Sequence, residues 1–288
     1  MTLLTLFALR LAAGLALGMA LVSPRETPSG YFRNHLYVAL GLSALAAVAG
    51  RSAAPEAFPW AVAAAVASYI GAVLWLYEKP RAGVAALLVV GAAGLAGAWH
   101  ATLAAKAAPP VVAEAAESKA GSPAGADRSA AGAPHPGAPQ PGAPHPGSTT
   151  LALLQCIGSA GLLGVTMASM LLGHWYLNAP GMALAPLFRQ IRALIGAAAF
   201  QACVCAAGAT MQATHVADFE VSQWWWLAIA MRWAFGILGV GVLAWMARET
   251  LKIPNTQSAT GILYVAVIGA FGGEIVSILL TTGAQYPL

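Results

Sequence analysis

Long apolar runs separated by short polar stretches dominate the sequence. Eight runs of about 17 to 25 residues, the length that crosses a bilayer as a helix, can be distinguished, of which the second is the shortest. They cover residues 3–22, 35–50, 58–77, 82–104, 151–175, 188–213, 224–247 and 260–280. Run length, rather than periodicity, therefore predicts an all-α integral membrane protein with about eight transmembrane helices.

The first run could instead be a secretory signal peptide, but its flanks argue for a helix that stays in the protein. No basic segment precedes it, Arg10 interrupts it, and the following LVSPRE is not a small-residue cleavage site. We therefore count it as the first membrane span.

Composition excludes a water-soluble fold. Hydrophobic residues make up 59% of the chain, charged residues only 8%, and the mean hydropathy is +0.72, whereas a soluble domain carries roughly 25% charged residues. The three cysteines, Cys156, Cys203 and Cys205, lie inside apolar runs, which argues against a disulfide or a metal site. Nothing indicates nucleic-acid binding, a phosphate loop or a hydrolase triad.

A segment rich in proline, glycine and alanine, residues 106–150, divides the chain. Such a composition lacks the branched and aromatic side chains of a core and predicts a disordered linker. Residues 1–105 and 151–288 then form two four-helix halves. Residues 22–41 align without a gap on residues 178–197, which indicates either a parallel internal repeat or a chance similarity. The alignment matches three pairs: Pro24 with Pro180, Phe32 with Phe188, and Arg33 with Arg189.

The distribution of basic residues predicts the orientation. The odd-numbered connections between spans carry Arg25, Arg33, Lys79, Arg81, Arg189, Arg192, Arg248 and Lys252. Among the short even-numbered connections only Arg51 is basic. The positive-inside rule places the odd connections in the cytoplasm. In a bacterial inner membrane, both termini and the linker would then be periplasmic.

Charged residues inside the spans are the first candidates for function, because the bilayer makes them costly and they seek partners. Arg232 and Glu274 fall at matching depths on the last two spans, so an ion pair between them is expected; Arg10 would snorkel to the interface. The pair could fix helix packing, or Glu274 could change its protonation as a bound group is oxidised or reduced. Gln201 adds polarity to the same half.

A second candidate cluster lies on the cytoplasmic side of the second half and contains His174, Trp175, Tyr176 and Gln257. His174 could bind a quinone or ligate haem, whereas the aromatic residues could be interface anchors. For a b-type haem, His35 could pair with His174 on one side of the membrane, and His100 with His215 on the other.

Eight spans in two halves with outward termini, together with the Arg232/Glu274 pair and the His174 cluster, resemble the quinol-interacting membrane anchors of polysulfide and dimethyl sulfoxide reductases. The linker departs from that pattern. The resemblance implies a haem-free subunit that passes electrons from quinol to partner redox subunits. We therefore expect a subunit of a redox complex that binds a quinone or haem in its second half. The alternative is a transporter or a non-catalytic structural subunit, and whether the protein is an enzyme stays open.

Overall fold

A computed structural model describes residues 1–107, 146–179, 181–215, 223–253, 255–281, 284 and 286–288. Helices account for nearly all of this part. In chain order they are α1 (Thr2–Ala20), α2 (Ser29–Ala53), η1 (Pro55–Ala57), α3 (Phe58–Leu76), α4 (Pro80–Ala107), α6 (Pro146–Asn178), α7 (Ala185–His215), α8 (Gln223–Met231), η3 (Arg232–Gly239), α9 (Val240–Thr250) and α10 (Thr256–Thr281).

The described helices include eight that are long and apolar enough to cross a membrane, as predicted. Segments α8, η3 and α9 together form one of these spans, in which η3 is a π-helix. Most helices extend beyond the apolar runs into the polar flanks, as helices that continue through the membrane interface do. The protein is therefore an all-α polytopic membrane protein.

Prolines set several helix boundaries. Pro80 and Pro146 are the first residues of α4 and α6, a position where the missing N–H costs nothing. Because α4 continues to Ala107 and α6 starts at Pro146, both edges of the expected linker, 106–107 and 146–150, are helical. The expectation of disorder concerns residues 108–145, which lie outside the described residues.

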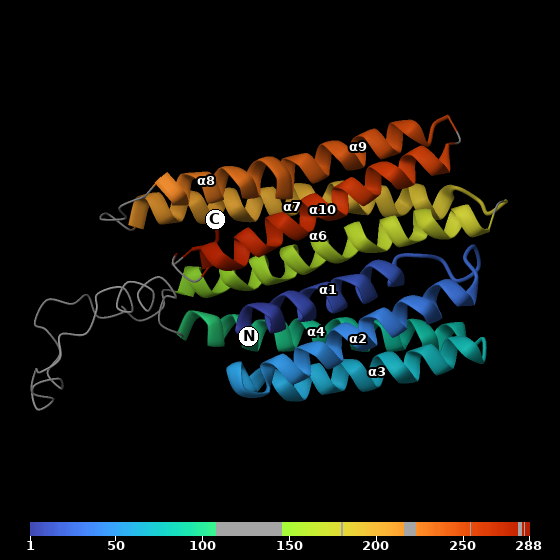
Figure 1. Cartoon of the computed structure of the whole chain (residues 1–288), viewed down its shortest axis with the longest axis horizontal. Coiled ribbons are helices and arrows are strands. Elements are labelled where there is room, and N and C mark those ends of the chain that lie inside the picture. Colours follow the sequence, from blue (N-terminus) through green and yellow to red (C-terminus); the bar gives the residue numbers. More distant parts are fainter. Residues whose placement is uncertain (108–145, 180, 216–222, 254, 282–283, 285) are drawn as a thin grey trace, which may run out of the picture.

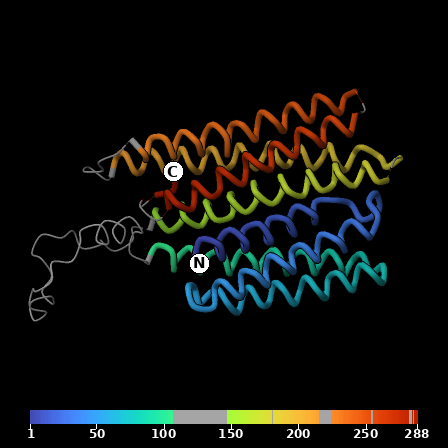
Figure 2. The backbone as a smooth tube through the Cα atoms, viewed as in Figure 1, coloured from blue at the N-terminus to red at the C-terminus, as the bar shows by residue number. Residues whose placement is uncertain are grey.

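The helices run side by side along the long axis of the molecule (Figure 1). Helices α1–α4, coloured blue to green, lie on one side, and α6–α10, coloured lime to red, lie on the other, with α1 next to α6. Both chain termini lie at one end of the bundle, which we call the terminal end (Figure 2). The connections α1–α2, α3–α4, α6–α7 and α9–α10 lie at the opposite end, which we call the loop end.

Small residues bring α1 and α6 into near backbone contact. A Cβ atom on Gly14 would lie 1.8 Å from the carbonyl oxygen of Ala160, and one on Gly164 would lie 1.9 Å from the carbonyl carbon of Gly14. Further along the same pair of helices, a Cβ on Gly18 would meet the Ala168 side chain at 2.9 Å. Small residues four apart on both helices are a known means of close packing in membranes. This contact joins the two groups of helices.

A second close contact forms inside the second group. A Cβ atom on Gly273 of α10 would lie 2.3 Å from the Cα atom of Gly236 in η3. Gly236 is about one turn from Arg232, and Gly273 directly precedes Glu274. The two glycine contacts therefore determine where the charged side chains of the membrane interior meet.

Candidate functional site

Glu274 forms a buried ion pair with Arg10. Arg10 Nη1 lies 2.6 Å from Glu274 Oε1, and the two side chains are 1% and 4% exposed. Arg10 Nη2 also donates to the hydroxyl of Thr102 on α4, at 3.3 Å. The contact therefore ties α1 and α4 to α10, across the boundary between the two groups of helices.

This pairing corrects two expectations. Arg10 does not snorkel to the interface but is fully buried, and Glu274 is paired with Arg10 rather than with Arg232. The expectation assumed that helices adjacent in sequence supply the partners. In the structure α1 lies in the middle of the bundle and contacts α10 as well as α6, so the first span reaches the last.

Arg232 uses a backbone carbonyl and a thiol instead of a carboxylate. Its Nη1 donates to the carbonyl oxygen of Gly273 at 3.0 Å, and its Nη2 to Cys205 Sγ at 3.4 Å. The side chain is 2% exposed and begins the π-helical segment η3. Single π-helical turns often occur at functional sites, and here the segment brings Arg232 next to the residue that precedes Glu274.

Amide, hydroxyl and thiol side chains connect Arg232 to α10, the helix that carries Glu274. Gln155 of α6 donates through Nε2 to Ser277 Oγ at 3.0 Å and to Ser159 Oγ at 3.3 Å. Gln201 of α7 donates through Nε2 to Gln155 Oε1 at 2.6 Å and to Cys205 Sγ at 3.3 Å. A row of hydrogen bonds thus runs from α10 through α6 and α7 to Arg232.

We call this set the polar layer; it consists of Arg10, Thr102, Gln155, Gln201, Cys205, Arg232, Glu274 and Ser277. By residue count and a rise of 1.5 Å per residue, Arg10 lies about 12 Å and Glu274 about 10 Å from the terminal end of its helix. Gln201 joins the layer, as its position inside an apolar run suggested. Gln155 carries the same signal, a lone amide within an apolar run, and was missed, as were Thr102, Cys205 and Ser277.

The charges of the polar layer do not balance. It contains two guanidinium groups and one carboxylate, and all three are buried. The Nε atoms of Arg10 and Arg232 and the Oε1 atom of Gln201 have no hydrogen-bond partner among the described residues. An unpaired charge in a bilayer is costly, and the two Nε donors without partners could bind a further anion or water.

A small cavity connects the polar layer to the terminal end. Its volume is about 10 Å³, which is close to the space that one water molecule needs. Its lining comprises Arg10, Thr102, Lys106, Ala152, Gln155, Thr281, Ala284, Tyr286 and Pro287. A proton or a water molecule fits this space, whereas a quinone ring does not.

The predicted cluster around His174 is only partly assembled. His174 is exposed, and its Nδ1 atom lies 3.3 Å from the hydroxyl oxygen of Tyr264. Tyr176 donates its hydroxyl proton to the Ala183 carbonyl at 2.5 Å, and Gln257 is exposed at the start of α10. Trp175 points elsewhere, toward aromatic side chains of α2. These residues share the loop end but do not form one binding site.

Trp175 packs instead near His35, a residue of the first half. The rings of His35 and Trp175 are 6.3 Å apart, and Tyr31 lies 4.6 Å from His35 and 6.1 Å from Trp175. His35 Nδ1 and Trp175 Nε1 are buried and have no hydrogen-bond partner within the described part of the chain. Both polar atoms therefore lie in an aromatic surrounding at the loop end.

The haem pairs stay predictions. His35 and His174 lie at the same end of the bundle, but His35 is buried between aromatic rings while His174 is exposed. The pair of His100 with His215 depends on a side chain outside the described part. Among the described residues, no group of three or more histidine, cysteine or acidic side chains could hold a metal ion.

No family model, curated protein or solved structure matches this chain. The resemblance to quinol-interacting membrane anchors therefore stays a prediction, and function has to be argued from the polar layer itself.

Proposed function

We propose that this polytopic protein accepts and releases a proton at Glu274, as the membrane subunit of a complex that oxidises a quinol. The observation that carries the proposal is the buried Arg10–Glu274 pair, 2.6 Å apart, within a layer that contains one carboxylate and two guanidinium groups. Ionisable residues inside a membrane commonly mark proton relays or substrate paths.

Glu274 is the one carboxylate of the polar layer, so it is the group of that layer that would take a proton from quinol. Quinol oxidation releases two electrons and two protons: a partner subunit with redox centres would take the electrons, one proton would pass to water at the membrane surface, and the other would pass to Glu274. The cavity of about 10 Å³ beside Arg10 provides space for the water through which this proton would reach the terminal end.

The quinone ring itself needs a different place. The buried His35 Nδ1 and Trp175 Nε1 atoms, both without partners among the described residues, support a carbonyl-binding position at the loop end, so a proton released there would reach Glu274 through water inside the bundle and not by direct contact. This position contains His35 in place of His174, which the sequence favoured. We expect extraction of purified protein to yield quinone, and a His35→Leu/Trp175→Phe variant to retain less of it.

Quinol oxidation in isolated membranes tests the proposal. Glu274→Gln keeps the size of the side chain and removes the acceptor, and general acid–base groups typically contribute 100- to 10,000-fold to a rate. We expect quinol-dependent proton release per folded molecule, with the folded fraction measured by size-exclusion chromatography in detergent, to fall at least tenfold in this variant. The exposed Glu78→Gln variant is the control and should keep full activity. Unchanged turnover in Glu274→Gln, together with no extractable quinone, would refute the proposal.

A transporter of a small anion is a second candidate, favoured by Arg232, whose buried charge has no carboxylate partner among the described residues. Such a protein needs an aqueous path to the polar layer. The native Cys156, which lies beside Arg10 and Glu274, should then react with a charged, water-soluble thiol reagent. Protection of Cys156 from labelling by a transported anion would support this candidate over the redox proposal.

A further inference from the structure

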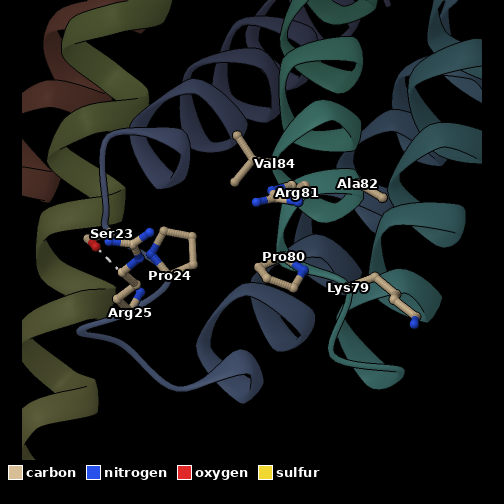
Figure 3. A pocket seen from close by; sticks show the side chains of 8 residues that line it. All are labelled: Ser23, Pro24, Arg25, Lys79, Pro80, Arg81, Ala82 and Val84. Carbon is tan, nitrogen blue, oxygen red and sulfur yellow. Dashed lines mark hydrogen bonds between the residues drawn. The ribbon is translucent and has the colours of Figure 1, made fainter.

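A large cationic pocket lies at the loop end of the bundle, whereas the polar layer lies nearer the terminal end. The pocket has a volume of about 910 Å³ and lies between the α1–α2 connection and the start of α4. Its lining consists of Ser23, Pro24, Arg25, Lys79, Pro80, Arg81, Ala82 and Val84. Figure 3 shows Arg25 and Arg81 on opposite sides of the pocket, while the Lys79 side chain extends away from both.

The cations of this pocket lack internal counter-charges. In the described part of the chain, Arg25, Lys79 and Arg81 form no ion pair. The pocket also includes the first residues of α4, a helix with no acidic residue in its first turn. The N-terminus of a helix carries a partial positive charge and exposes free N–H groups. Two arginine side chains and a helix end therefore direct positive charge into one space, with Lys79 at its edge.

A corresponding pocket in the second group of helices provides an internal comparison. It has a volume of about 320 Å³ and is lined by Ala185, Phe188, Arg189, Arg192, Arg248 and Lys252. It lies between the start of α7 and the α9–α10 connection. In its group these places correspond to the α1–α2 connection and the start of α4 in the first group. Here two carboxylates already neutralise half of the charge of the four basic residues. Arg189 pairs with Glu26, and Lys252 and Arg248 pair with Glu249 at 2.6 and 3.6 Å.

We propose that the pocket around Arg25 and Arg81 binds the phosphate group of an anionic membrane lipid. Guanidinium groups bind phosphate through two parallel hydrogen bonds, and basic pockets between transmembrane helices are known positions for anionic headgroups. Pro24, Ala82 and Val84 give the pocket apolar walls beside its cations. Its place at the ends of α1, α3 and α4 corresponds to the depth of lipid headgroups.

Binding of defined lipids to the purified full-length protein tests this proposal. Native mass spectrometry and thermal unfolding would compare phosphatidylglycerol, phosphatidylcholine and inorganic phosphate. We expect phosphatidylglycerol to bind and to raise the unfolding temperature, with little effect of phosphatidylcholine. A basic residue near an anionic lipid contributes roughly 1 kcal/mol, so Arg25→Gln/Arg81→Gln should weaken binding about 30-fold, which is about 2 kcal/mol at 1.4 kcal/mol per tenfold.

Arg248→Gln/Lys252→Gln is the matched control, because it removes the same charge from the pocket that already contains carboxylates. It should leave phosphatidylglycerol affinity within about threefold of wild type. Equal losses in both double variants would overturn the proposal in favour of general charge attraction. Binding of inorganic phosphate that depends on Arg25 and Arg81, without binding of phosphatidylglycerol, would overturn the lipid as the ligand. Stabilisation by phosphatidylcholine equal to that by phosphatidylglycerol would overturn the recognition of charge.

Discussion

Replacing Glu274 with glutamine should strongly destabilise the protein, because the change leaves the Arg10 guanidinium buried without its counter-charge. Arg10 is fully buried, and among the described residues it would keep only the uncharged partners Thr102, at 3.3 Å, and Cys156. Removing one member of a buried ion pair typically costs about 3–5 kcal/mol. This loss corresponds to a decrease of roughly 150- to 4,000-fold in the folding equilibrium, at 1.4 kcal/mol per tenfold.

A double-mutant cycle separates the ion pair from other effects of the substitution. Arg10→Met in the Glu274→Gln background removes the unpaired charge, so the double variant should be less destabilised than the two single losses predict. We expect a coupling energy of about 2–3 kcal/mol. Equilibrium unfolding in mixed detergent micelles, followed by tryptophan fluorescence, gives the free energies of unfolding for all four proteins.

The cycle of Arg232→Met with Glu274→Gln is the control, because Arg232 donates to the Gly273 carbonyl and not to the carboxylate. Its coupling energy should stay below about 1 kcal/mol. Additive losses in the Arg10/Glu274 cycle, together with strong coupling of Arg232 to Glu274, would refute the pairing described here and restore the one expected from the sequence.

Two further substitutions test the close helix packing, and a third tests the Arg189–Glu26 ion pair. Gly164→Leu should destabilise the protein by at least about 1–3 kcal/mol in the same unfolding measurement, because its Cβ would meet the Gly14 backbone at 1.9 Å, whereas Gly161→Leu, with open space around it, should cost far less. Gly273→Ala should likewise lower the unfolding temperature more than Gly272→Ala, which has no atom within 4 Å of the added Cβ; equal shifts would argue against the close contact of α10 with η3. Arg189→Gln removes an ion pair whose two side chains are 38% and 34% exposed, so solvent screening should limit its cost to less than about 1 kcal/mol, and a larger loss would indicate a further role.

The membrane fold could be predicted from the sequence because each span is a local property. A run of apolar residues long enough to cross the bilayer must form a helix, whatever its neighbours are. All eight expected spans are present as helices. Only their ends differ, as in α2, which starts at Ser29 rather than at His35, because helices continue through the interface where composition is mixed.

The site was harder to predict because it depends on which helices are neighbours. Glu274 and Gln201 could be selected from their cost in lipid alone. The partner of Glu274 could not, because the contact with Arg10 joins residues 264 positions apart. The glycines that bring α1 against α6 carry little information within a sequence that contains 31 glycines. The lengths of the apolar runs therefore could not predict that α1 contacts the second group of helices.

The separation between Arg10 and Glu274 also has a consequence for how the protein is made. At roughly 5–20 residues per second, the ribosome adds Glu274 about 13–53 s after Arg10, since 264 residues separate them. During this time α1 is in the membrane with an arginine that has no acidic partner. A position about 12 Å from the helix end allows the side chain to reach the lipid headgroups meanwhile. Final assembly of the bundle must therefore wait for the last helix, whose arrival draws the arginine inward.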